Sequence, residues 1–195
     1  MKKQRKIVTV VGKTGYGKSY LIKSIISRLH RVVIFDLMSE YAEEKEFDFS
    51  DFQYFRRLND FLSYLQTVNR LDAIQVRITF DNEEHYEAAL QACLLVGDVV
   101  CVIEEVHNFS SAYYLSPTLE KIVRFGRHKA ISLICITQRF SDIGVLLRNN
   151  IDLLVCFNLT APNDLKYLAE LPYVGETAQE VGKLKKHQFY AFLNV

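Results

Sequence analysis

One short segment near the start of the chain has the residue types needed to hold a row of phosphates. Residues 12–19 are GKTGYGKS, which fits the spacing G-x-x-x-x-G-K-[ST] in full. Its glycines let the backbone curl so that successive amide groups point at an anion. A helix that begins near Gly17 would add the positive end of its dipole. The segment predicts a site for the phosphates of ATP; a glycine-rich turn that binds nothing is the alternative.

Every residue of this loop, and the one after it, is a candidate nucleotide-binding residue. They are Gly12, Lys13, Thr14, Gly15, Tyr16, Gly17, Lys18, Ser19 and Tyr20. Lys18 is also a candidate catalytic residue, because its charge can reach the β- and γ-phosphates. Ser19 is a candidate metal ligand, because its hydroxyl can bind Mg²⁺.

Two adjacent carboxylates end an apolar run at residues 98–105, DVVCVIEE. Acids at the carboxyl end of a core strand lie where α/β proteins bind their ligands. Glu104 is the candidate ligand of Mg²⁺, directly or through water, and Glu105 is the candidate catalytic residue that polarises the attacking water. A solvated strand end is the alternative interpretation. A second acid favours hydrolysis over a small-molecule kinase, whose acceptor is a bound substrate rather than water.

A second apolar run with a polar end covers residues 131–139, ISLICITQR. Gln138 is placed there to contact the γ-phosphate or the lytic water, and it is a candidate catalytic residue. A glutamine that caps the next helix is the alternative. Arg124 and Arg127 lie just before this run and could stabilise the charge that builds on a transferred phosphoryl group, as could Arg148. A basic, solvated turn is an equally good interpretation for each arginine.

The elements that must position these residues alternate between strands and helices. Strand-like apolar runs are predicted at residues 6–11, 32–36, 74–80, 99–103, 131–137, 153–159 and 188–193. Helices are predicted at residues 18–29, 59–68, 83–95, 117–125, 142–147 and 162–169. Several strands are continuously apolar, as expected where helices cover both faces of a parallel sheet. The order predicts a doubly wound, mostly parallel α/β sheet with helices on both faces, formed by residues 1–195 as a single domain. With the GKTGYGKS loop, this arrangement resembles the P-loop NTPases of RecA-like type.

Composition narrows the class of protein further. The chain has 195 residues and a net charge of +1, so no global field draws it to nucleic acid or anionic lipid. Each of its four cysteines lies in an apolar run, which is typical of reduced core cysteines. We find neither a signal peptide nor an apolar stretch of membrane-spanning length. We therefore expect a soluble cytoplasmic protein, located in the host cytoplasm or on the virion if it is viral.

Together these motifs resemble the FtsK–HerA superfamily of DNA-pumping ATPases. The resemblance covers most of the chain. It rests on five elements in the family's order: the GKTGYGKS loop, Asp36 with Glu40-Tyr41, the box Glu104-Glu105-Val106-His107, Gly126-Arg127 with Thr137-Gln138-Arg139, and Asn163-Asp164. Glu104 is a departure, because many relatives have aspartate there. The small size of the chain is similar to that of the genome-packaging ATPases of internal-membrane icosahedral viruses.

The resemblance implies a homo-oligomeric ring that uses ATP and Mg²⁺ to move double-stranded DNA. In it Glu105 would activate water, Gln138 would sense the γ-phosphate, and Arg127 or Arg124 would act on a neighbouring subunit. Capsid-vertex or membrane proteins are further candidate partners. A HerA-like cellular or plasmid translocase and an assembly ATPase like the zonula-occludens-toxin proteins of filamentous phages are the alternatives. For the pore we consider the loop at residues 107–116, with Tyr113 and Tyr114, and residues 183–186; the latter could equally be a solvated turn.

The segment at residues 43–57 is crowded with acids and aromatic residues. We expect a loop or a short strand whose rings pack on the edge of the sheet. A surface for a partner or for DNA is the alternative.

Overall fold

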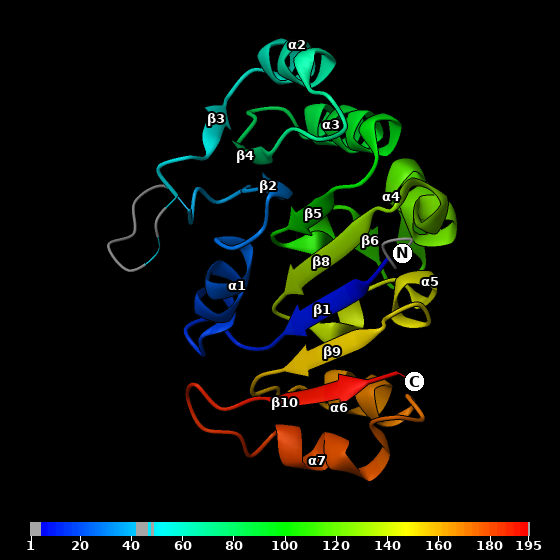
Figure 1. Ribbon diagram of the computed structural model, residues 1–195. Coiled ribbons are helices and arrows are strands. Elements are labelled where there is room, and N and C mark those ends of the chain that lie inside the picture. The colour runs from blue at the N-terminus through cyan, green and yellow to red at the C-terminus, as the bar shows by residue number, and fades with distance from the viewer. Residues whose placement is uncertain (1–4, 42–46, 48, 195) are drawn as a thin grey trace.

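A computed structural model of the chain describes residues 5–41, 47 and 49–194. Eight strands form one sheet in the order β10-β9-β1-β8-β5-β2-β4-β3 (Figure 1). The strands are β1 (Ile7–Val11), β2 (Arg31–Phe35), β3 (Gln53–Phe55), β4 (Ile74–Ile78), β5 (Val100–Ile103), β8 (Ser132–Thr137), β9 (Leu153–Cys156) and β10 (Tyr190–Leu193). All neighbours are parallel except β10, which runs antiparallel to β9.

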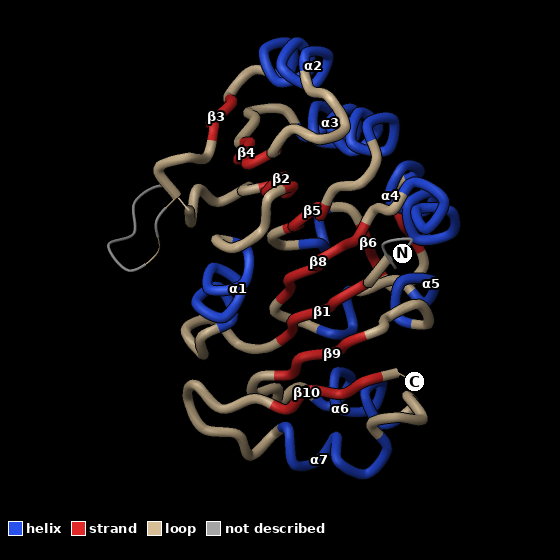
Figure 2. The backbone as a smooth tube through the Cα atoms, in the orientation of Figure 1, coloured by secondary structure: helices blue, strands red, loops and turns tan. Residues whose placement is uncertain are grey.

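The helices lie on both faces of this sheet (Figure 2). They are α1 (Lys18–Ile26), α2 (Leu58–Thr67), α3 (Glu83–Val96), α4 (Pro117–Phe125), α5 (Val145–Arg148), α6 (Pro162–Ala169) and α7 (Ala178–Val181). Ile22 and Ile26 of α1 join one hydrophobic cluster, whereas residues from α2, α3, α4, α6 and α7 join a second. The doubly wound, mostly parallel sheet expected from the sequence is confirmed.

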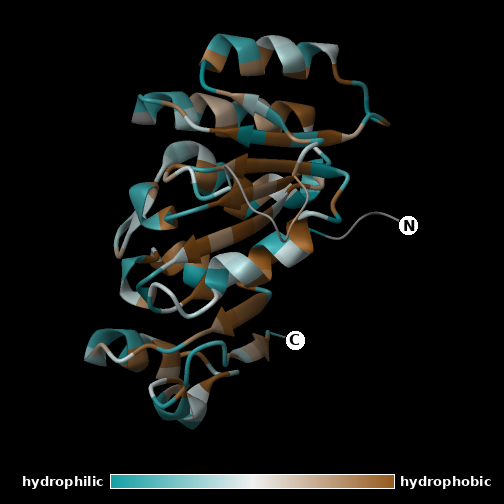
Figure 3. Ribbon diagram, turned by 90° about the vertical axis from the view of Figure 1, so that its left-hand side faces the viewer, coloured by the Kyte–Doolittle hydropathy of each residue, from teal (hydrophilic) through white to brown (hydrophobic). Residues whose placement is uncertain are grey.

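The pattern of apolar residues explains why the two clusters form. Successive side chains of a strand point to opposite faces, so Ile7 and Val11 of β1 enter the larger cluster while Val10 enters the smaller one. Hydrophobic residues are concentrated along the central strands, and hydrophilic residues occur on the outer surfaces of the helices (Figure 3). All four cysteines are buried and unbridged.

Several predicted elements are shorter in the structure: α1 ends at Ile26 rather than at residue 29, and β9 ends at Cys156 rather than at residue 159. Three further differences concern the elements themselves. A short antiparallel hairpin, β6 (Ser110–Ser111) with β7 (Tyr114–Leu115), lies in a segment for which we expected only a loop. Helix α5 begins at Val145, because residues 140–142 form a separate 3₁₀ turn. The four-residue helix α7 was not expected, because its length is too short for a periodic pattern to be visible.

Part of the aromatic segment at residues 43–57 forms the edge of the sheet, as one of our two interpretations held. Strand β3 pairs with β4, and the ring of Phe49 packs edge-on against those of Tyr41 and Phe52. Residues 42–46 and 48 lie outside the described part of the chain. Among the described residues, none of the helices combines the length and the apolar character needed to cross a bilayer.

The packing of α3 gives a test of this arrangement. Leu90 is fully buried in the larger cluster, whereas Leu95 on the same helix is 75% exposed. We expect Leu90→Ala to lower the free energy of unfolding by about 2–5 kcal/mol. Leu95→Ala should change it by no more than about 0.5 kcal/mol. Urea titration followed by circular dichroism measures both, and equal losses in the two variants would contradict the assigned face of α3.

Candidate active site

The predicted chemistry converges at one edge of the sheet. The glycine-rich loop follows β1, the acid pair follows β5, and Gln138 follows β8. These three strands are neighbours and parallel, so their carboxyl ends meet. Together they line a cavity of about 280 Å³, whose walls are Thr14, Gly15, Gly17, Lys18, Ser19, Tyr20, Glu40, Glu104, Glu105, Ile136, Gln138, Lys186 and His187.

The glycine-rich loop has the backbone that an anion cradle needs. The φ values of Gly12, Gly15 and Gly17 are 149°, 77° and 104°, which residues other than glycine rarely adopt. At Gly12 there is also no room for a side chain, because a Cβ atom there would lie 2.5 Å from the Cβ of Phe157. The loop is fixed at its base by Lys13, whose amide donates to the Asn158 carbonyl at 3.0 Å.

Lys18 begins α1 and lies almost fully inside the loop. Its ammonium donates to the carbonyl oxygens of Gly12 at 2.7 Å and Lys13 at 3.1 Å. Burial lowers the pKa of Lys18, while the carboxylates of Glu105, Glu104 and Glu40 act in the opposite direction. The ammonium therefore lies between the loop and a group of negative charges, within the cavity where the oxygens of a triphosphate would bind.

Glu104 is the more buried member of the acid pair, with 3% of its surface exposed. Burial raises its pKa to about 7, and a hydrogen bond donated by the hydroxyl of Tyr41 opposes that shift. A cation bound beside Glu104 would favour its ionised form. The nearby Ser19 hydroxyl donates to Oε2 of Glu40 at 2.8 Å.

Glu105 lies between two side chains that can orient it. Nε2 of Gln138 donates to its Oε1 at 2.9 Å, and Nδ1 of His107 lies 3.1 Å from its Oε2. Glu105 itself has a left-handed backbone, with φ of 51°, and begins the 3₁₀ turn at residues 106–108. Backbone strain of this kind is concentrated at functional sites. The carboxylate is held at the cavity through Oε1, which accepts from Gln138, while Oε2 is buried and has no hydrogen-bond partner among the described residues. A carboxylate fixed in this way is suited to act as a base that positions water.

The oxygens of Ser19 and Glu104 could bind Mg²⁺ only together with the phosphates of a bound nucleotide. Among the described residues, no group of three or more histidine, cysteine or acidic side chains could hold a metal alone. Mg²⁺ commonly takes one or two protein oxygens and completes its shell with phosphates and waters. Ser19 and Glu104, both on the cavity wall, are suited to that role.

The three candidate arginines lie away from this cavity. Arg124 lies in the last turn of α4 and pairs with Glu120 at 2.7 Å. Arg127 lines a separate basic cavity near the amino ends of β2, β5 and β8. The guanidinium of Arg148 is mostly buried and lies 4.3 Å from the centre of the Tyr167 ring. Arg148 therefore has a packing role in its own chain, and neither Arg124 nor Arg127 reaches the nucleotide cavity of its own chain.

Two parts of the cavity wall were not predicted as nucleotide contacts. Glu40 was noted only as part of the family resemblance. His187 comes from the segment before β10, where its amide donates to the Tyr16 carbonyl at 3.2 Å; its neighbour Lys186 was considered only for the pore. No local pattern identifies residues 186–187, because antiparallel pairing of β10 with β9 brings them to the loop.

Other predicted residues occupy distinct places. Tyr20 is 57% exposed at the rim, and its ring lies 5.0 Å from that of Phe47. Tyr113, at the tip of the β6–β7 hairpin, is 96% exposed. The segments around Arg139 and Asp164 meet, with Nε of Arg139 3.1 Å from a carboxylate oxygen of buried Asp164.

Comparisons with known proteins agree with this fold. Residues 1–142 match a family model described as an AAA domain. The fold resembles the genome-packaging NTPase B204 from Sulfolobus turreted icosahedral virus 2 in complex with AMPPCP. The TM-score is 0.74 at 26% identity, over 95% of this chain and 91% of that one. The complex of B204 with ATP-gammaS gives 0.73 at 27%, over 96% and 91%.

More distant structures share the fold. The N-terminal domain of zonular occludens toxin from Neisseria meningitidis matches with a TM-score of 0.50 at 11% identity, over 82% of this chain and 79% of that one. A sequence comparison with curated proteins gives no match. The fold and the phosphate loop define a P-loop ATPase. The chain belongs to the AAA domain family, and the expected resemblance to viral genome-packaging ATPases is confirmed.

Gly12 allows a direct test of the phosphate loop. Gly12→Ala places a Cβ against Phe157 at an unfavourable φ, whereas Gly175→Ala has a positive φ of 53° with nothing within 4 Å. We expect Gly175→Ala to lose about 1–3 kcal/mol of stability from backbone strain, and Gly12→Ala to lose more, because its Cβ also collides with Phe157. Only Gly12→Ala should also weaken ATP binding, because the loop must move away from Phe157. Calorimetric titration with ATP measures this, and full affinity in Gly12→Ala would contradict the assigned cradle.

Proposed function

We propose that this protein is a Mg²⁺-dependent ATPase of the FtsK–HerA type that translocates double-stranded DNA, packaging a viral genome into a preformed capsid. The observation that carries the proposal is the contact between Gln138 and Glu105 at the cavity that also contains Lys18. A binding module needs the phosphate loop alone. An oriented carboxylate beside the loop supports hydrolysis of ATP. The likeness to B204, a genome-packaging NTPase, supports double-stranded DNA as the polymer that is moved.

Each residue then has a defined task. Lys18 would neutralise charge on the β- and γ-phosphates, and Ser19 with Glu104 would hold the Mg²⁺ that accompanies the nucleotide. Glu105 accepts a proton from the attacking water, and Gln138 keeps that carboxylate aligned while sensing the γ-phosphate. Bound Mg²⁺ would supply electrostatic stabilisation of the transferring phosphoryl group.

The function is tested by measuring ATP turnover with and without double-stranded DNA. We expect DNA to stimulate turnover, and Glu105→Gln to lower it by about 10²- to 10⁴-fold while ATP binding persists, because the base is lost and the cradle is intact. Glu120→Gln removes an exposed carboxylate of α4 and serves as the control.

Other outcomes would redirect the assignment. Unchanged turnover in Glu105→Gln would remove Glu105 from the mechanism. Turnover that ignores DNA but responds to a coat or membrane protein would favour a secretion ATPase like zonular occludens toxin. Phosphoryl transfer to a nucleoside monophosphate would favour a kinase.

We also propose that Arg127 acts on the site of a neighbouring subunit in a head-to-tail ring. Arg124 is already paired with Glu120 on its own helix, so Arg127 is the better donor. Arg127→Ala and Glu105→Gln subunits should each be inactive alone. Mixed in equal amounts, they should recover up to about a quarter of wild-type turnover. In a ring assembled at random, about a quarter of the interfaces pair a subunit that keeps Glu105 with a neighbour that keeps Arg127.

The same mixture made with Arg124→Ala provides the comparison. Recovery with Arg124→Ala but not with Arg127→Ala would exchange their roles. An Arg127→Ala protein with full activity by itself would exclude the proposed donor.

A further inference from the structure

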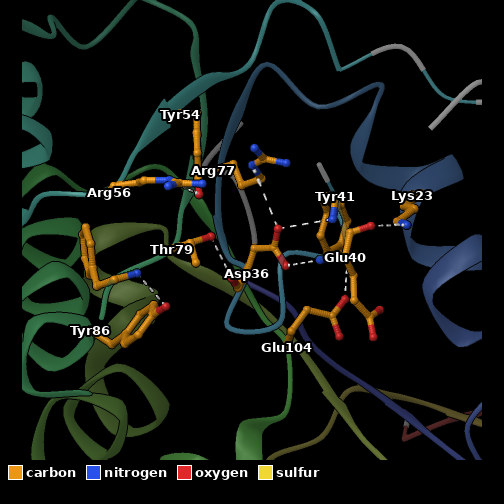
Figure 4. Close-up of polar contacts among 11 residues, drawn as sticks. Lys23, Asp36, Glu40, Tyr41, Tyr54, Arg56, Arg77, Thr79, Tyr86 and Glu104 are labelled. Carbon is orange, nitrogen blue, oxygen red and sulfur yellow. Dashed lines mark hydrogen bonds and ion pairs between the residues drawn. The ribbon is translucent and has the colours of Figure 1, made fainter. Parts of the chain in front are cut away.

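The hydroxyl of Tyr41 is buried beside the acid pair. Tyr41 is 2% exposed and donates a hydrogen bond to Oε1 of Glu104 (Figure 4). Its ring is held independently, since it meets Phe49 edge-on at 5.8 Å and lies 4.9 Å from the ammonium of Lys23. The ring packing and the hydroxyl contact are therefore separable.

The turn that carries Tyr41 is fixed by buried charges. The carboxylate of Asp36, which is fully buried, accepts from the amide of Glu40 at 2.7 Å and from that of Tyr41 at 3.2 Å. The ammonium of Lys23, 3% exposed, donates to the Glu40 carbonyl at 2.7 Å. The Nε atom of Arg77 also lies 3.9 Å from this carboxylate. Amides bonded to a buried carboxylate have little freedom to move, because breaking the contact removes hydrogen bonds that a buried charge needs.

This turn contacts both predicted metal ligands. Glu40 accepts from the Ser19 hydroxyl at 2.8 Å, and Tyr41, the next residue, donates to Glu104. We propose that Tyr41 is a positioning residue for the metal side of the ATP site, where its hydroxyl sets the orientation of the Glu104 carboxylate. The proposal rests on the proposed function, because it takes Ser19 and Glu104 as the ligands of Mg²⁺.

The physical consequence concerns metal affinity rather than phosphate affinity. With Oε1 held by Tyr41, the other oxygen of Glu104 is the one free to face a cation. Without the hydroxyl, a buried carboxylate oxygen has no donor and the side chain can turn to find another. Loss of a partner that orients a metal ligand typically lowers metal affinity by about 10- to 100-fold. The contacts of Lys18 with the loop do not involve Tyr41.

Tyr41→Phe tests this, because it keeps the ring and removes one oxygen. The matched control is Tyr86→Phe, which removes the hydroxyl of another buried tyrosine. That hydroxyl accepts from the Phe80 amide at 2.8 Å (Figure 4), and Tyr86 is not among the residues that line the nucleotide cavity. Binding of ATP-gammaS is measured by calorimetry, first with excess EDTA and then during titration with Mg²⁺. Thermal unfolding of each variant is recorded in parallel.

We expect Tyr41→Phe to raise the Mg²⁺ concentration for half-maximal binding by about tenfold, with metal-free affinity unchanged. Tyr86→Phe should leave both quantities at wild-type values. A second variant, Glu40→Ala, removes an exposed side chain and should also raise the Mg²⁺ requirement, since Ser19 loses its acceptor.

Three results would overturn the proposal. One is an unchanged Mg²⁺ requirement in Tyr41→Phe, another is an equal shift in Tyr86→Phe, and the third is a loss of metal-free affinity alone. Failure of DNA to stimulate the wild-type protein would remove the translocation proposal and leave this one standing. Wild-type binding that ignores Mg²⁺ would overturn both.

Discussion

The parallel pairing of β1 with its two neighbours is the constraint on which the site depends. Val11 pairs with Thr137 of β8 and with Cys156 of β9, so the chain leaves all three strands at one level. The Gly12 amide then donates to the Thr137 carbonyl at 3.3 Å, and that of Lys13 to the Asn158 carbonyl. These bonds extend the strand pairing two residues beyond β1, as far as Lys13. The loop must curl there, and only glycine fits beside Phe157.

The same register places the chemistry of β5 and β8 within reach. Ile103 pairs with Phe35 and with Cys135, so Glu104 emerges beside the turn after β2 and Glu105 faces the end of β8. Parallel strands in register therefore convert separate motifs into one cavity. A shift of one residue would send each acid to the opposite face of the sheet.

Much of this could be predicted because the information is local. The strands and main helices have their own periodicity, and the phosphate loop and the acid pair each follow a strand. The parts that escaped prediction depend on distant pairing. Glu40 reaches Ser19 because Asp36 folds the intervening turn, and His187 reaches Tyr16 because β10 reverses direction. The motif formed by Asp36 with Glu40-Tyr41 does not show that Glu40 meets Ser19, and the residues around His187 carry no signature. Helix α7 is too short for its periodicity to be visible.

The carboxyl and amino edges of the sheet also differ in the charged residues that line their cavities. Glu40, Glu104 and Glu105 gather at the carboxyl edge with Lys18 and Lys186. Arg31, Arg70, Arg127 and Lys129 line a cavity at the amino edge together with Asp98. In the proposed ring, one edge of a subunit would face the other edge of its neighbour, so attraction between unlike charges would favour head-to-tail contact. A triphosphate adds negative charge at the carboxyl edge, which would strengthen that contact. Nucleotide occupancy and ring closure would then be thermodynamically linked, because each favours the other.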